Sequence, residues 1–322
     1  MFTNHKGVVL ISVLLIVLIL SAISVSIGKY YFLSFTREGY VDFQNNALQY
    51  SRNLETFALH EMKKEFKFSK QFFPKNHVLL TQPIYIELEN GTLHATLADA
   101  TNCFNINSLF DYRDQQYIAN SKAVAGFHKL LRLLEFDHNA IDSLTDQILD
   151  WVDVDDQPRS NGLEDYYYIG PMHAAKQFTS KRLFYHLSEL KSLPATRDIA
   201  WQVFSQHFCV RPVTRDNYAI NLNTLESGDV FLLASVYPNL SLDDAASIIG
   251  SIPEEGFEST GQLTNAFPNF DFSTAHVPVS LTTKWFYLDT NITFQEYSAT
   301  SRTLININNN NANIVSRSYN GI

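Results

Sequence analysis

The side chains best suited to chemistry are carboxylates that crowd one segment of the chain. They are Asp153, Asp155, Asp156, Glu164 and Asp165. Pro158 and Gly162 lie among them, and both residue types favour a loop over a helix or strand. Carboxylate oxygens are hard ligands, and Ca²⁺ accepts about six to eight oxygens in irregular geometry. The segment therefore predicts a calcium site, with Asp153, Asp155 and Glu164 as the best ligands and Asp156 and Asp165 as further candidates.

Two other interpretations of the acidic segment stay open. The first is a solvated loop in which Arg159 pairs with one carboxylate at small energetic gain. The second is a pair of acids that performs general acid–base catalysis, as in glycosidases. An EF-hand is excluded, because Gln157 stands where that loop has Asp or Asn, and Pro158 stands where it needs a glycine.

The rest of the chain supplies no recognisable active site. The 10 histidines show no metal-ligand spacing, and the sequence contains no glycine-rich phosphate loop and no Gly-x-Ser-x-Gly motif. Cys103 and Cys209 have no catalytic neighbours in sequence. We therefore predict a protein that is not an enzyme.

The two cysteines have a simpler use. In an oxidising compartment, Cys103 and Cys209 are expected to form one disulfide. Closing the long loop between them would stabilise the fold by about 4–5 kcal/mol in the chain-entropy model. Two buried free thiols remain the alternative.

An apolar run at residues 8–27 is expected to anchor the rest of the chain. As a helix it would span about 30 Å, the hydrocarbon thickness of a bilayer. A polar leader, residues 1–7, ends in Lys6-Gly7 directly before this run. Cleavage between Gly7 and Val8 would leave the membrane segment on the mature chain. An ordinary signal peptide cut after residues 24–26 is the alternative.

Periodicity predicts an α+β fold for the flanking regions. Apolar residues spaced by three and four between Tyr40 and Phe57 predict that the helix continues past the anchor, and the pattern fades near Met62. Alternation on both sides of Asn90-Gly91 predicts a β-hairpin. Four further strands are expected at 284–289, 292–297, 303–308 and 314–319. The result is a long helix packed on an antiparallel sheet.

The region between the hairpin and the last strands is predicted to be helical and repetitive. Helices are expected at 122–134, 139–151, 183–191, 198–208, 225–237 and 242–249. The string FNINSL at 104–109 is echoed by INLNTL at 220–225, and LSEL at 187–190 corresponds to TGQL at 260–263. Two related helical modules, each similar to a SAM or helix-hairpin-helix unit, would explain the echo. Coincidence is the alternative, because the repeated strings are short.

Charge limits the choice of partner. The chain has 24 basic and 33 acidic residues, a net charge of −9. Nucleic-acid binding normally needs a basic face, so no nucleic-acid partner is expected.

No second apolar run is long enough to span a membrane, so one crossing is predicted. The leader interpretation places the bulk of the chain outside the cytoplasm.

Three motifs together resemble the minor pseudopilin K family of the type II secretion system. The first is KGVVLIS at 6–12, similar to the family's basic-Gly leader end and apolar start. The second is FNINSL at 104–109, similar to Phe-Asn-Leu-Asn-x-Leu. The third is DWVDVDDQPRSNGLEDYY at 150–167, similar to Asp-Trp-x-Asp-x-Asp-x-x-Pro-Arg-x-x-Gly-x-Glu-Asp. The matches span most of the chain.

The resemblance implies a structural subunit at the tip of the periplasmic pseudopilus, anchored in the inner membrane of a Gram-negative bacterium. It implies processing by prepilin peptidase, contacts with minor pseudopilins I and J and through them with the major pseudopilin, and calcium in the helical insert. The predicted divisions are a leader at 1–7, a membrane helix at 8–28, a pilin-like helix and hairpin at 29–104, helical modules at 105–215 and 216–275, and C-terminal strands at 276–322.

Ser12 gives the tip position a physical reason. If cleavage follows Gly7, Ser12 becomes the fifth mature residue, where most pilins and pseudopilins have Glu. That carboxylate can neutralise the buried N-terminal amine of a neighbouring subunit, because an unpaired charge is costly in an apolar medium. A subunit with nothing above it needs no such counter-charge. The alternative is that Ser12 is simply a hydroxyl tolerated in a membrane helix.

Two other functions remain as alternatives. One is a membrane-anchored binding module whose helical halves grip nucleic acid or an exported substrate. The other is a calcium-dependent periplasmic hydrolase on a membrane anchor.

Overall fold

One helix organises the molecule. The computed structural model describes residues 6–66, 72–171, 176–308 and 311–320, so the predicted leader lies mostly outside the described residues. Helix α1 (Lys6–Phe66) is continuous for 61 residues, roughly 90 Å at 1.5 Å per residue. Residues 9–42 are all exposed, and the most apolar window has a mean hydropathy of 2.9. The helix is therefore long and apolar enough to cross a membrane before it reaches the folded domain.

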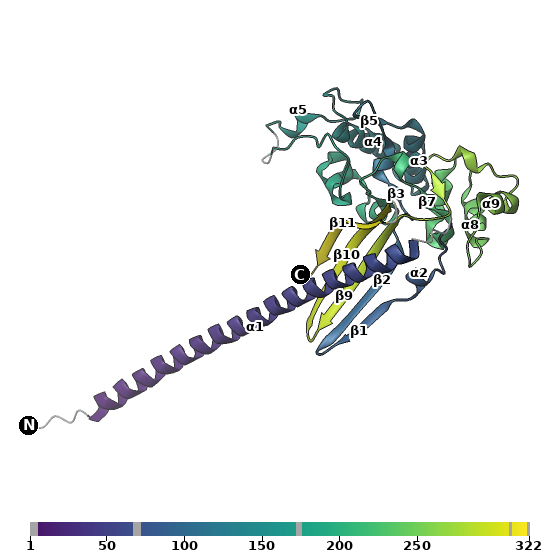
Figure 1. The fold of residues 1–322 in the computed structure, drawn as a ribbon. Coiled ribbons are helices and arrows are strands. Elements are labelled where there is room, and N and C mark those ends of the chain that lie inside the picture. The colour runs from purple at the N-terminus through teal and green to yellow at the C-terminus, as the bar shows by residue number, and fades with distance from the viewer. Residues whose placement is uncertain (1–5, 67–71, 172–175, 309–310, 321–322) are drawn as a thin grey trace, which may run out of the picture.

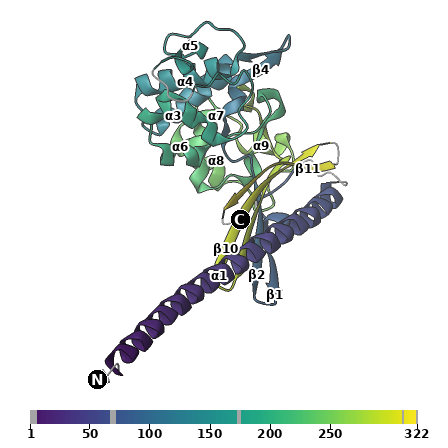
Figure 2. The ribbon, with the colours of Figure 1, turned by 90° about the vertical axis from the view of Figure 1, so that its left-hand side faces the viewer.

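The C-terminal part of α1 covers one face of an antiparallel sheet (Figures 1 and 2). The strand order is β1-β2-β9-β10-β11, with bounds β1 (Ile84–Leu88), β2 (Gly91–Asp99), β9 (Trp285–Phe294), β10 (Tyr297–Asn308) and β11 (Asn311–Asn320). The predicted hairpin is confirmed, because Leu88 pairs with Gly91 across its turn. The long helix on an antiparallel sheet is likewise confirmed.

The sequence predicts four strands in the C-terminal region, and the structure forms three, β9, β10 and β11. The prediction puts a break at Thr290-Asn291, between strands at 284–289 and 292–297. The structure has no break there, because both residues belong to β9 and Asn291 pairs with His94 of β2. The chain turns later, at Gln295, which has a φ of 51°.

The apolar stripe of α1 also differs from the prediction. The core between helix and sheet takes Phe43, Ala47 and Leu54, as predicted, and continues with Ala58 and Met62. The predicted Tyr40, Tyr50 and Phe57 are 39%, 38% and 52% exposed. A strict alternation of three and four drifts around a helix with 3.6 residues per turn, so Tyr50 and Phe57 leave the line of buried residues. Tyr40 lies before Phe43, the first residue of that core.

A helical insert separates two neighbouring strands of the sheet, β2 and β9. Its helices are α3 (Ser121–Leu133), α4 (His138–Val152), α5 (Asp165–Tyr168), α6 (Trp201–His207), α7 (Val230–Val236), α8 (Leu242–Gly250) and α9 (Thr260–Ala266). Short strands pair β3 (Phe104–Asn105) with β6 (Phe208–Cys209), β4 (Phe110–Arg113) with β5 (Gln116–Ala119), and β7 (Ile220–Asn221) with β8 (Val279–Ser280). A short α2 (Val78–Thr81) precedes the sheet. The insert therefore has its own core, distinct from the one beneath α1.

Three predicted helices of the insert are wrong in extent. The helix predicted at 198–208 is shorter, since α6 spans only Trp201–His207. The segment predicted at 183–191 is only a 3-10 helix, Leu187–Ser192, because the Phe184 carbonyl, which an α-helix would offer to the N–H of Ser188, accepts from the side chain of Asn107 instead. The helix predicted at 225–237 begins only at Val230, since the Asp229 carboxylate accepts the N–H of Glu226 and closes a 3-10 turn first.

One carboxylate joins the sheet to the insert. Asp99, the last residue of β2, accepts hydrogen bonds from the N–H and hydroxyl of Thr101 and from the hydroxyl of Thr283, at 2.7–2.8 Å. Its second oxygen accepts from Asn221 at 3.0 Å and from Thr224 at 2.7 Å. Both ends of the insert and its second half therefore meet at one side chain.

The predicted disulfide residues lie at the base of the insert. Cys103 and Cys209 are joined by a disulfide beside the parallel pair of β3 and β6. The bond links the start of the insert to the strand that follows α6.

Candidate metal centre

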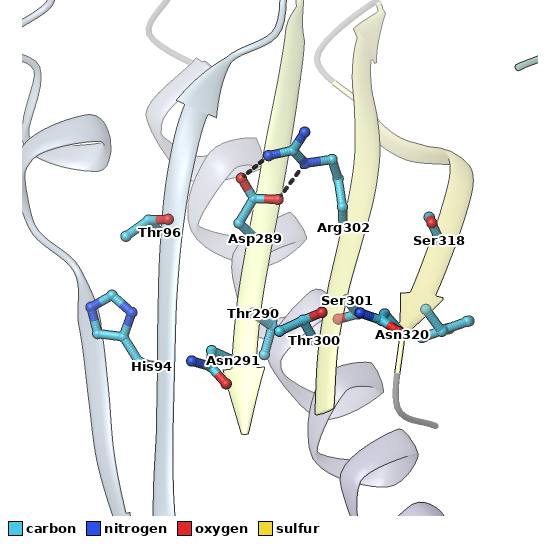
Figure 3. A pocket seen from close by; sticks show the side chains of 11 residues that line it. His94, Thr96, Asp289, Thr290, Asn291, Thr300, Ser301, Arg302, Ser318 and Asn320 are labelled. Atoms are coloured by element: carbon cyan, nitrogen blue, oxygen red, sulfur yellow. Dashed lines mark hydrogen bonds and ion pairs between the residues drawn. The ribbon is translucent and has the colours of Figure 1, made fainter. Parts of the chain in front are cut away.

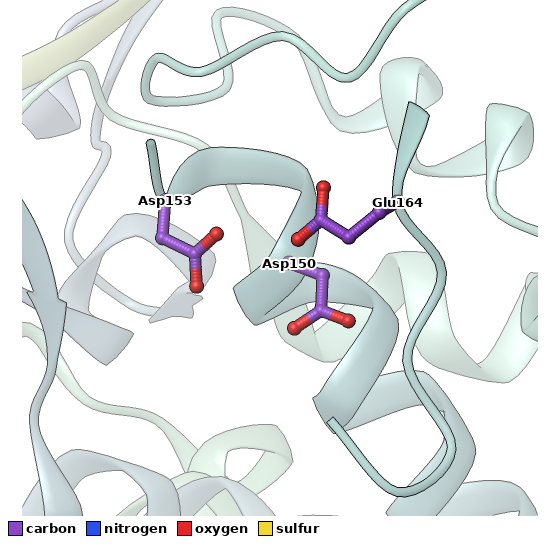
Figure 4. A group of neighbouring side chains, drawn as sticks. All are labelled: Asp150, Asp153 and Glu164. Atoms are coloured by element: carbon purple, nitrogen blue, oxygen red, sulfur yellow. The ribbon is translucent and has the colours of Figure 1, made fainter. Parts of the chain in front are cut away.

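Three buried carboxylates converge at the C-terminal end of α4. Asp150 and Asp153 are three residues apart, so they lie on the same side of the helix end. Glu164 comes from the chain just before α5 (Figure 4). Ligand oxygens of the three residues lie within 4.8 Å of one another, and the residues are 0%, 7% and 1% exposed. We call these three residues the acidic triad.

Packing around α4 brings Glu164 to this place. The carbonyl of Trp151 accepts the N–H groups of Ser180 and Lys181, both at 3.1 Å, which ties the end of α4 to a later segment. The Trp151 ring makes an edge contact with Tyr168 of α5, with centroids 5.1 Å apart. Glu164 stands at the N-terminal cap of α5 but makes no capping bond with its side chain. Its carboxylate therefore belongs to the acidic triad rather than to the helix terminus.

Arg159 is the cation already present in this site. Its Nη1 donates to Asp150 Oδ1 and, at 2.6 Å, to Asp153 Oδ2. Its backbone N–H donates to Asp150 Oδ2 at 3.1 Å. The solvated-loop interpretation paired Arg159 with one carboxylate, whereas the arginine bonds two, both of them buried.

Gly162 permits the loop to close on Asp150. A Cβ atom at this position would lie 1.7 Å from Asp150 Oδ2, and the carboxylate is buried and bonded through both oxygens to Arg159, so it is not free to move aside. The Gly162 N–H also donates to the Arg159 carbonyl at 3.0 Å. Only a residue without a side chain allows this approach, which gives the glycine in the acidic motif a physical role.

Three oxygens of the acidic triad have no hydrogen-bond partner among the described residues. They are Asp153 Oδ1 and both carboxylate oxygens of Glu164. A buried carboxylate without a partner is costly. Burial and the neighbouring charges of Asp150 and Asp153 raise the pKa of Glu164 to about 8. Burial also raises the pKa of Asp150 and of Asp153, against the opposing effect of Arg159. Three unpartnered, buried, hard oxygens fit a divalent cation such as Ca²⁺.

The other predicted ligands lie outside the acidic triad. Asp155 is exposed, and its Oδ1 accepts the N–H of Gln157. Asp156 is also exposed and forms an ion pair with Lys181 at 2.8 Å. Asp165 accepts the N–H and hydroxyl of Thr179, both at 2.7 Å. These bonds hold the loop in place.

The sequence interpretation did not include Asp150 among the ligands. The available signal was its spacing of three residues from Asp153, because the helix predicted at 139–151 puts both side chains on one face. That signal needed the helix to reach Asp153, and α4 does so with Asp153 as its C-cap.

The predicted processing residues lie at the start of α1. The backbone of Gly7 and Val8 is helical, and Ser12 follows about one turn later, on the exposed half of the helix. This region makes no part of the folded core.

A polar hollow of about 410 Å³ lies on the sheet face opposite α1 (Figure 3). Arg302 donates from Nε and Nη2 to the two oxygens of Asp289, at 2.6 and 2.9 Å, and its guanidinium stacks 4.8 Å from the Tyr287 ring centroid. This ion pair is satisfied internally. The remaining lining consists of hydroxyls, two amides and the imidazole of His94.

Comparison with known proteins decides the family. Two family models of the type II secretion system protein K match residues 102–213 and 220–275, which together exceed half of the 322 residues. The chain belongs to the type II secretion system protein K family. As a family member it is a minor pseudopilin of type II secretion, with α1 as a single-pass anchor in the inner membrane.

Relatives of the family align over most of the chain. The type II secretion system protein K of Pectobacterium carotovorum subsp. carotovorum is 24% identical over 332 residues, covering 100% of this chain and 98% of the relative. The Aeromonas hydrophila protein K is 26% identical over 277 residues, covering 82% and 81%. The fold matches a chain in the crystal structure of the GspK-GspI-GspJ complex from enterotoxigenic Escherichia coli, with a TM-score of 0.74 and 21% identity over 88% of this chain and 99% of that chain.

Proposed function

We propose that this chain forms the tip of the pseudopilus and helps to start its assembly with minor pseudopilins I and J. The placement of the helical insert carries this proposal. The insert sits at the end of the sheet farthest from the N-terminus of α1 (Figures 1 and 2). Its bulk occupies the space where a further subunit would stack, while the exposed apolar half of α1 remains available to pack beside other helices. The structural relative, solved with GspI and GspJ, supports these two partners.

Ser12 supports the same position. A repeating subunit offers a carboxylate at the fifth mature residue to the amine of the subunit above, whereas Ser12 offers only a hydroxyl. The chain would then contact the major pseudopilin through I and J, below it in the filament.

A gold label on the insert tests the tip position. Asp243 is exposed on α8, so Asp243→Cys provides an attachment point far from the anchor. We expect one gold particle at one end of each isolated pseudopilus in electron micrographs. Unlabelled filaments from the chain without the added cysteine serve as the control. Particles distributed along the filaments would contradict the proposal.

We further propose that prepilin peptidase cleaves between Gly7 and Val8. The mature chain is expected to begin at Val8, and Gly7→Leu should abolish processing, so that the N-terminal peptide retains the leader. Gly28→Ala is the matched control, because a Cβ at Gly28 meets no atom within 4 Å. Intact-mass spectrometry of both variants from native membranes decides the matter. A wild-type chain that begins near Ile27 would indicate ordinary signal cleavage instead.

We also propose that the acidic triad holds a structural Ca²⁺. Asp153 and Glu164 supply three unpartnered oxygens, and Asp150 completes the negative site. The bound ion would neutralise carboxylates that are otherwise costly to bury. The hydrolase alternative has no comparable support, since Asp150 and Glu164 are at most 1% exposed and leave no room for an organic substrate.

The insert is further proposed to consist of two related modules, each SAM-like or helix-hairpin-helix-like. Asn107 donates to the carbonyl of Phe184 and accepts its N–H, and Asn223 does the same with Phe257. The side chain of Glu189 accepts the N–H of Tyr185, four residues earlier in the chain. The side chain of Gln262 accepts the N–H of Glu258 in the same way. Equivalent residues of the two sequence echoes thus make equivalent bonds, which supports a duplication.

A further inference from the structure

We propose that Arg159 is a permanent second cation of the acidic site and sets its preference for divalent over trivalent ions. The inference rests on the proposed calcium function. When Glu164 ionises to bind an ion, three carboxylates face one guanidinium, so two negative charges remain for that ion. One divalent cation balances that charge, whereas a trivalent cation leaves an excess positive charge in a buried place.

The contacts of Arg159 keep it in the site. Both oxygens of Asp150 are bonded by this one residue, Oδ1 by the guanidinium and Oδ2 by the backbone N–H. Asp150 cannot swing away from it, because Gly162 packs directly against its carboxylate. The arginine is therefore held by main chain and side chain together, not by a single flexible ion pair.

The unpartnered oxygens differ from the oxygens that bind Arg159. Arg159 uses Oδ2 of Asp153, while Oδ1 of the same carboxylate has no partner. Both oxygens of Glu164 are also unpartnered and make no bond with Arg159 among the described residues. An ion bound to these three oxygens does not need to displace the guanidinium. Arg159 thus acts as a positioning residue, since it orients two carboxylates and adds a fixed charge.

This arrangement makes a quantitative prediction about selectivity. Coulomb repulsion from a fixed guanidinium grows with the charge of the bound ion. Its removal therefore strengthens Tb³⁺ binding more than Ca²⁺ binding, and we expect the ratio of the two affinities to rise about tenfold. If the guanidinium instead left the site on binding, both affinities would change together and the ratio would stay constant.

The experiment measures Ca²⁺ and Tb³⁺ affinities of the full chain in detergent by isothermal titration calorimetry. Arg159→Gln is expected to raise the Tb³⁺ to Ca²⁺ affinity ratio about tenfold. The matched control is Arg182→Gln, which removes an arginine that pairs with Glu189 outside the acidic triad and should leave the ratio unchanged. The double variant Arg159→Gln with Asp150→Asn restores two negative charges and should return the ratio to its wild-type value.

Two results overturn the proposal, and they differ in whether the calcium function falls with it. If the wild type binds Ca²⁺ and the ratio in Arg159→Gln stays within twofold of wild type, the calcium function stands and the role of Arg159 falls. If the wild type binds neither ion, both fall. Should Arg159→Gln fail to fold, Asp150→Asn alone provides the test. It leaves one negative charge, so it should lower the ratio about tenfold, and an unchanged ratio would contradict the proposal.

Discussion

Loss of the disulfide between Cys103 and Cys209 is expected to lower the free energy of unfolding by about 4 kcal/mol. The two residues are 106 positions apart, so the bond removes a large amount of conformational freedom from the unfolded chain. For a domain of this size, the loss corresponds to a fall in Tm of about 10 °C. The double variant Cys103→Ser with Cys209→Ser, followed by circular dichroism during heating, measures the effect.

The variant should still fold at low temperature, because other bonds hold the same junction. Asn105 accepts the N–H of Arg211 at 2.9 Å, and Asn107 donates to the carbonyl of Arg211 at 2.7 Å. The Arg211 side chain is 1% exposed and donates to the carbonyl of Ala100 at 3.1 Å. The control is a reducing agent, which should lower the Tm of the wild type by the same amount and leave the double variant unchanged. A loss below 1 kcal/mol would mean that the unfolded chain is already restricted around these residues.

The features that the sequence predicted well depend on local or strongly periodic signals. An apolar run at 8–27 needs no tertiary contact to indicate a spanning helix, and Asn90-Gly91 between alternating strands specifies its own turn. In each case the residue type dictates the backbone geometry around it.

The features that the sequence missed depend on distant partners. The strand break expected at Thr290-Asn291 is absent because β2 and β10 pair with both residues on either side. The helix expected at 183–191 is mostly absent because Asn107, far away in sequence, takes the backbone bonds of Phe184. Local polarity indicated a turn and local periodicity indicated a helix, and tertiary hydrogen bonds overrode both.

The candidate metal centre was predicted in part for the same reason. Composition and the family resemblance predicted a cation among the acids of 153–165, and Asp153 and Glu164 do converge. Which acids are buried depends on where α4 ends and where the loop returns. Asp150 belongs to the site because it lies in the last turn of α4. Asp155 is exposed to solvent, and Asp156 forms an ion pair with Lys181. A loop of many carboxylates therefore indicates a cation but does not rank its ligands.

The stability of the metal-free chain is expected to fall as the pH rises from about 5 to 8, and Glu164 is the reason. Its pKa is about 8 in the folded protein against an ordinary value of 4.5. Between these values the folded state keeps a proton that the unfolded state has lost, so raising the pH favours unfolding. The full effect of this one group is about 5 kcal/mol, because each pKa unit of difference corresponds to about 1.4 kcal/mol.

Calcium should reverse this trend. The ionised carboxylate is the form that binds the ion, so a saturating concentration of Ca²⁺ stabilises the fold most at pH 8, where the metal-free chain is weakest. Thermal melts with chelator and with Ca²⁺ at pH 5.5, 6.5, 7.5 and 8.5 measure both curves. The difference between the two Tm values is expected to widen steadily with pH.

Two variants isolate Glu164 from other titrating groups. Burial also raises the pKa of Asp229 to about 6, and lowers the pKa of His128 and of His207, so the wild-type curve alone is composite. Glu164→Gln removes the titration at this position and should leave the metal-free Tm about equally high at pH 8.5 and pH 5.5, once the shared background is subtracted. Glu254→Gln, at an exposed position outside the acidic triad, should follow the wild type. If the curves of Tm against pH are parallel for the chelated wild type and for Glu164→Gln, the prediction is wrong. Glu164 is then ionised in the folded protein at neutral pH, with no proton in the place proposed for the metal.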